Sequence, residues 1–164
     1  MSSIKSETHP APIASYTPPI LPENTIATLA NICGYAAYEN GFHDHFEDIR
    51  AELVENEDVA RPDFTFDLPM TPEVIDHIGA KLMLITTEIS EAMEVVRKGV
   101  PLDHIWEGKN GKPEGFVVEM LDAAIRIFDL LHMLGLDTVV DLDTALMKKL
   151  TFNSSRGPMH GKKV

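Results

Sequence analysis

Two long segments of the sequence carry apolar residues at the spacing of an amphipathic helix, and this pattern restricts the chain to a helical fold. The first segment begins at Thr71 and Pro72, where threonine can cap a helix and proline suits its first turn, and it extends to Gly99. The second runs from about Phe116 to Gly135 with the same 3.6-residue period. Segments of this length pack well as antiparallel helices, so the sequence predicts an all-α fold with a four-helix-bundle-like core.

Shorter helices are expected on either side of these two segments. Apolar periodicity predicts one helix from Asn24 to Glu39, with Asn24 or Thr25 as its cap, and Asn40 and Gly41 end it. A short helix is expected over 42–50 and a final one over 138–153. No alternating strand pattern is found, and the glycines of segment 102–115 predict a mobile loop there.

The composition of the chain indicates one domain preceded by an arm. Residues 1–22 contain five prolines and little apolar material, so we expect a flexible arm, and residues 23–164 form a single domain of ordinary size. A formal net charge of −12 opposes attraction to nucleic acid or to an anionic membrane. The single cysteine, Cys33, fits a reducing compartment, and no apolar run suits a membrane span, so a cytoplasmic location is expected.

Four acidic residues stand inside the two long apolar segments in two pairs of the same spacing. Glu88 and Glu91 are three positions apart, as are Glu119 and Asp122, so each pair projects from one side of its helix. Like charges at this spacing repel each other, and a bound divalent cation would remove the repulsion. Hard oxygen ligands favour Mg2+ or Mn2+. The alternative is that each pair lies on a solvated helix face, where such spacings are common.

This arrangement resembles the MazG-like all-α nucleoside triphosphate pyrophosphohydrolases, whose signature is Glu-x-x-Glu, a variable gap, and Glu-x-x-Asp. Here the gap comprises the 27 residues from 92 to 118, which is on the long side for that family. The similarity extends from about Asn24 to Val164. Besides the four acids it includes the segments 81–85, 91–94, 97–99 and 125–129, and the closing residues Lys149, Asn153, Arg156, His160, Gly161, Lys162 and Lys163.

The resemblance implies an enzyme that hydrolyses a nucleoside or deoxynucleoside triphosphate to the monophosphate and pyrophosphate, for nucleotide-pool cleaning or control of deoxynucleotide supply. It implies that Glu88, Glu91, Glu119 and Asp122 bind magnesium and carry the catalysis. Lys149 and Asn153 would hold the triphosphate, with Arg156 and Lys162 as further contacts. It also implies a homodimer or a dimer of dimers, with the nucleotide in a cleft partly formed by the neighbouring subunit.

Two other functions remain open at this stage. One is a noncatalytic helical interaction module whose acids are solvated. The other is a carboxylate-bridged redox metalloprotein, but such proteins carry a histidine three residues after a ligand glutamate, where this chain has Glu91 and Asp122. His43 and His45 resemble a metal-binding cluster, yet no further ligand follows at a suitable spacing, so a surface position is expected for both.

Overall fold

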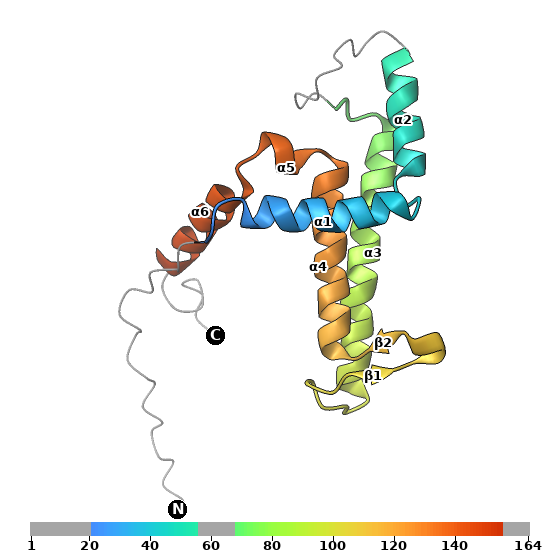
Figure 1. Cartoon of the computed structure of the whole chain (residues 1–164), viewed down its shortest axis with the longest axis vertical. Helices are drawn as coiled ribbons and strands as arrows, with labels where there is room; N and C mark the ends of the chain where they lie inside the picture. Colours follow the sequence, from blue (N-terminus) through green and yellow to red (C-terminus); the bar gives the residue numbers. More distant parts are fainter. Residues whose placement is uncertain (1–20, 56–67, 156–164) are drawn as a thin grey trace, which may run out of the picture.

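Two long helices, α3 (Pro72–Arg97) and α4 (Phe116–Met133), lie side by side and antiparallel in the computed structural model of the chain (Figure 1). The structure describes residues 21–55 and 68–155. α1 (Thr25–Glu39) crosses this pair and packs mainly on α4, while α2 (Asp44–Glu55) lies along α3 near the end where α3 begins. α5 (Leu136–Val139) and α6 (Leu142–Ser155) complete the order. The predicted all-α class is confirmed, and within the described residues the long antiparallel helices are the pair α3 and α4.

The ends of α3 follow the sequence signals. The Thr71 hydroxyl accepts a hydrogen bond from the Val74 amide at 3.4 Å, and Pro72 occupies the first turn. Beyond the other end, Gly99 adopts a φ of 68°, a left-handed conformation that glycine reaches without a steric penalty. The local sequence therefore sets the length of the helix that carries Glu88 and Glu91.

The start of α1 differs from the prediction. Asn24 makes no side-chain cap; instead the amides of Thr25 and Ile26 each donate to the Asp143 carboxylate at 2.8 Å. Asp143 belongs to α6, so the helix is capped by a residue far away in the sequence. This contact joins the first and last helices of the described chain.

Two further predictions about the chain after α3 were wrong. The segment expected to be a mobile loop contains an antiparallel hairpin, β1 (Trp106–Glu107) and β2 (Pro113–Glu114), with the short helix η1 (Lys109–Gly111) at its turn. Strands of two residues are too short to show alternation in a sequence. The single final helix expected over 138–153 is divided, because Asp141 caps α6 by accepting hydrogen bonds from the Thr144 amide and hydroxyl at 2.9 and 2.7 Å.

The hydrophobic core is small and lies where α2, α3 and α4 meet. Phe46, Leu130 and Met133 are buried in it, and Ile85 packs against them. Many large apolar side chains of the two long helices remain exposed, namely Ile75, Leu82, Met83, Leu84, Ile89, Met93 and Val96 on α3 and Val117, Met120, Leu121, Ile125 and Ile127 on α4. No helix among the described residues has the length and apolarity required to cross a membrane.

Candidate metal centre

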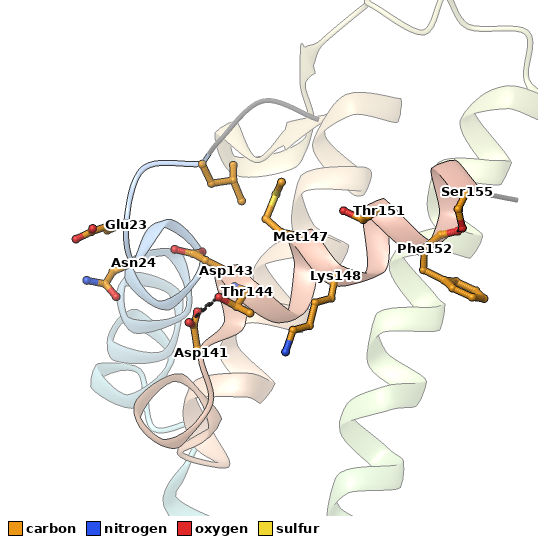
Figure 2. Close-up of a pocket in the computed structure, with 11 residues that line it drawn as sticks. Glu23, Asn24, Asp141, Asp143, Thr144, Met147, Lys148, Thr151, Phe152 and Ser155 are labelled. Carbon is orange, nitrogen blue, oxygen red and sulfur yellow. Dashed lines mark hydrogen bonds between the residues drawn. The ribbon is translucent and has the colours of Figure 1, made fainter. Parts of the chain in front are cut away.

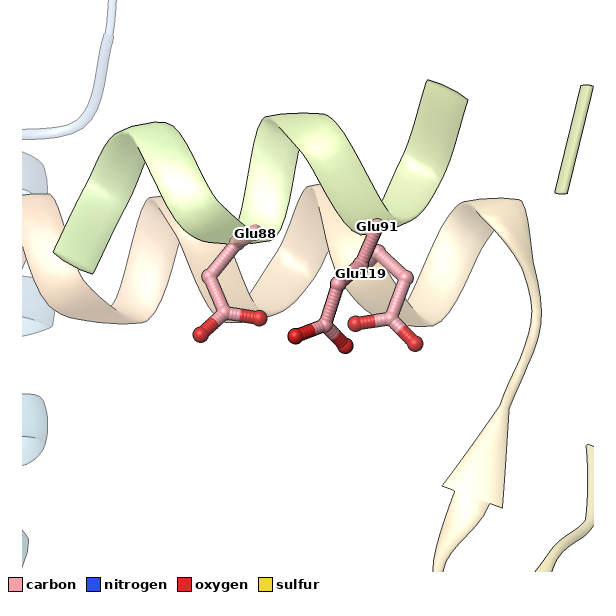
Figure 3. A group of neighbouring side chains, drawn as sticks. All are labelled: Glu88, Glu91 and Glu119. Atoms are coloured by element: carbon pink, nitrogen blue, oxygen red, sulfur yellow. The ribbon is translucent and has the colours of Figure 1, made fainter. Parts of the chain in front are cut away.

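Three of the four predicted acids converge on one side of the α3–α4 pair. Glu88 and Glu91 come from α3 and Glu119 comes from α4. Each residue contributes one carboxylate oxygen, and these three oxygens all lie within 4.8 Å of one another. Figure 3 shows the three carboxylates extending toward the same side of the two helices. We call these residues the acidic triad. Antiparallel packing brings them together although the sequence separates Glu91 from Glu119 by a complete loop and hairpin.

Two members of the acidic triad are buried to an extent that is unusual for carboxylates. Glu88 is 5% exposed and Glu119 is 4% exposed, whereas Glu91 lies at the open side. Oε2 of Glu119 is fully buried and accepts no hydrogen bond from the residues that the structure describes. A buried acceptor without a partner has a large desolvation cost, and two neighbouring carboxylates add repulsion to it.

The same surroundings raise the pKa of Glu119. Burial is the largest cause, and the negative charges of Glu91, Asp122 and Glu88 act in the same direction, while Lys112 partly opposes them. A divalent cation would supply a partner for the orphaned oxygen and compensate the repulsion. Among residues 21–55 and 68–155, the donors brought together here are carboxylate oxygens only, a set that suits Mg2+ or Mn2+ and lacks the nitrogen and sulfur ligands typical of zinc.

Asp122 is not part of this convergence. It lies one turn after Glu119 on α4 and is partly buried, and its charge contributes to the raised pKa of Glu119. It offers no oxygen within the 4.8 Å group formed by the acidic triad. Of the four predicted ligands, three therefore converge, and the fourth, Asp122, lies nearby without joining them.

A residue that the sequence indicated only as part of the similar segment 125–129, without a role, also contacts the triad. Nε of Arg126 donates to Oε1 of Glu88 at 2.6 Å. Arg126 follows Asp122 by four positions and Glu119 by seven, so the three residues share one face of α4. That spacing was available in the sequence, but without the position of α3 it did not identify Glu88 as the partner.

The predicted phosphate-binding residues lie apart from the acidic triad within one chain. Lys149 and Asn153 belong to α6, which extends beyond one end of α1, away from the part of α3 and α4 next to the hairpin (Figure 1). Lys149 is exposed, and its Nζ lies 5.7 Å from the centre of the Phe152 ring. Arg156 and Lys162 lie outside the described residues.

A cavity of about 840 Å3 occupies the space between α6 and the residues that precede α1. Its walls include Asp141, Asp143, Lys148 and Phe152, which Figure 2 shows around the opening. None of the acidic triad lines it. The carboxylates and this cavity are therefore separate features of the chain.

The fold and the acidic triad can be compared with those of known proteins. Comparison of the chain with family models, with curated proteins and with solved structures finds no match.

Proposed function

We propose that this chain is a magnesium-dependent nucleoside triphosphate pyrophosphohydrolase that releases a monophosphate and pyrophosphate from a ribo- or deoxyribonucleotide. The observation that carries the proposal is the acidic triad with its buried, unpartnered Glu119 Oε2. Arg126 compensates Glu88, but the buried Glu119 beside two other carboxylates destabilises the protein unless a further cation accompanies it. The resemblance of the sequence to the MazG-like enzymes supplies the reaction class.

In this proposal Glu88, Glu91 and Glu119 hold the ion and Asp122 extends the site by one helical turn. Bound magnesium supplies neutralisation of phosphate charge and orientation of a water molecule. The water oxygen forms a bond to the α-phosphorus, the bond to the bridging oxygen breaks, and pyrophosphate leaves. A carboxylate of the site accepts the water proton.

A second copy of the chain completes the proposed enzyme as a homodimer or a dimer of dimers. The exposed apolar side chains of α3 and α4 form a surface that water solvates poorly, and another helix pair packed on it would give a four-helix bundle. The separation of α6 from the acidic triad within one chain also favours a shared site, in which α6 of a second copy supplies Lys149 and Asn153.

The oligomer is tested by light scattering coupled to size-exclusion chromatography. The unmodified protein is expected to elute as a dimer or tetramer, and Leu121→Asp, which places a charge on the apolar face of α4, is expected to dissociate it. Leu102→Asp is the matched control, because Leu102 is similarly exposed but lies in the loop after α3. A monomeric unmodified protein would contradict the shared site.

The activity is tested with a panel of ribo- and deoxyribonucleoside triphosphates and Mg2+, scored for monophosphate and pyrophosphate. Glu91→Gln and Asp122→Asn are the inactivating controls. Diphosphate and inorganic phosphate as products would contradict the proposed bond. A noncatalytic helical module would show neither hydrolysis nor a magnesium-dependent rise in thermal stability.

A further inference from the structure

Arg126 sits at the edge of the acidic triad with most of its hydrogen-bonding capacity unused. Its Nε donates to Glu88 Oε1 at 2.6 Å, and the structure records no other hydrogen bond or ion pair of Arg126 within the described residues. A guanidinium carries five N–H donors, of which four lie on its two terminal nitrogens. The Arg126 side chain is 41% exposed while that of Glu88 is 7% exposed, so the arginine reaches from a buried carboxylate toward solvent.

The bond to Glu88 orients the arginine as well as the carboxylate. A guanidinium is planar, so a fixed Nε contact restricts the orientation of the terminal fork. Such a fork matches two oxygens of a phosphate group, a geometry that a lysine ammonium does not reproduce. The salt bridge therefore leaves an organised pair of donors beside the carboxylates.

The partly exposed guanidinium of Arg126 is placed to receive an anion beside the acidic triad. Once a divalent ion has joined the acidic triad, Glu88 is shared between that ion and Arg126. The predicted phosphate contacts Lys149 and Asn153 lie on α6, outside this neighbourhood in one chain. Arg126, by contrast, lies on α4 and already contacts Glu88, which is a proposed metal ligand.

We propose that Arg126 is a substrate-binding residue that holds a phosphate group of the nucleoside triphosphate at the metal centre, with its orientation fixed by Glu88. This inference rests on the proposed function. It adds a phosphate contact from α4 to those proposed for Lys149 and Asn153 on α6. The alternative is that Arg126 only positions Glu88, since residues that hydrogen-bond to metal ligands tune the affinity for the metal.

Isothermal titration calorimetry on the full chain separates these roles. The probes are Mn2+ alone, and then, in the presence of saturating Mn2+, the α,β-methylene analogue of the triphosphate that the activity panel shows to be hydrolysed fastest. The variants are Arg126→Gln and Arg126→Lys. Arg97→Gln is the matched control, because Arg97 forms a salt bridge of the same 2.6 Å length with Glu94 on the exposed surface of α3.

The expected result is that Arg126→Gln binds Mn2+ within about threefold of the unmodified protein but binds the analogue about 10- to 100-fold more weakly, the effect of losing a charged hydrogen bond. Arg126→Lys keeps the positive charge but not the planar pair of donors, so its affinity for the analogue should lie between those of Arg126→Gln and the unmodified protein. Arg97→Gln should match the unmodified protein in both titrations. Circular dichroism of each variant checks that the helices are retained.

Two results overturn the inference while leaving the proposed function intact. One is unchanged binding of the analogue by Arg126→Gln. The other is an equal loss of affinity for Mn2+ and for the analogue, which would make Arg126 a positioning residue for Glu88. If the unmodified protein binds neither probe, the proposed function fails together with this inference.

Discussion

Nε2 of His43 lies 2.6 Å from Oδ1 of Asp129, and both residues are buried. Nζ of Lys81 lies 3.6 Å from the other oxygen of Asp129 and donates to the Phe42 carbonyl at 3.0 Å. The three side chains join the turn before α2 to α3 and α4. A buried carboxylate that is shared in this way fixes how the elements meet, since each group would be unpaired in any other packing.

Removal of the shared carboxylate is therefore expected to be costly. Asp129→Ala leaves His43 and Lys81 without their partner, and we expect the free energy of unfolding to fall by about 3–5 kcal/mol. Urea denaturation measures the loss. Glu94→Ala breaks an exposed ion pair with Arg97 and should cost less than about 1 kcal/mol. Equal effects of the two substitutions would show that the buried network contributes nothing specific.

Glu119→Gln is expected to raise the thermal stability of the metal-free protein and to abolish its stabilisation by Mg2+. Burial raises the pKa of Glu119 above its unfolded value, so the folded protein holds that proton more tightly and loses stability as pH rises through the folded pKa. Without metal at neutral pH the neutral amide should therefore increase thermal stability. Added Mg2+ should stabilise the unmodified protein, by about 2.7 kcal/mol at one hundred times Kd, and should not stabilise the variant.

The pH dependence of metal binding provides an independent check on the same residue. Metal ions bind deprotonated carboxylates, so the affinity of the acidic triad for Mn2+ should increase with pH up to the raised pKa of Glu119 and level off above it. Calorimetry in buffers of different pH measures this. A flat profile would contradict the assignment of Glu119 as a ligand.

Gly34 is required where α1 crosses α4. A Cβ at Gly34 would overlap Cδ2 of His132, and Nδ1 of His132 is hydrogen-bonded to Asp137 at 2.7 Å, so the ring has little freedom to move away. Gly34→Ala should cost about 1–3 kcal/mol by overpacking. Gly79 lies in α3, where a Cβ would meet no atom within 4 Å, so Gly79→Ala should stabilise the protein by about 0.5–1 kcal/mol. Thermal unfolding of the two variants should move in opposite directions.

The lowered pKa of His77 predicts that mild acid destabilises the protein. The pKa is lowered chiefly by burial, and the positive charges of Lys81, His45 and His43 act in the same direction. Folding therefore favours neutral His77, so its contribution is complete above the unfolded pKa of about 6.5 and is lost as pH falls through the lower folded value. Between pH 7.5 and pH 5, His77→Gln should lose less unfolding free energy than the unmodified protein. The exposed His104→Gln should retain the original pH dependence.

The sequence by itself determined the elements whose signals are local. Thr71 with Pro72 marks the start of α3, Gly99 follows its end, and the apolar period fixes α4. The same period places Glu88 beside Glu91 on one helix face. These features depend on residues within a few positions of one another, because the hydrogen bonds and side-chain faces of a helix repeat every few residues.

Only the tertiary structure decided which distant groups meet. His43 was expected at the surface and is buried, because Asp129 from α4 gives it a partner that its neighbours do not provide. Lys81 from α3 contacts the other oxygen of the same carboxylate. Asp122 lies outside the acidic triad, and Arg126 meets Glu88, because the crossing of α3 and α4 selects which turns face each other. Spacing along a helix gives the face on which a residue lies, but packing determines what that face contacts.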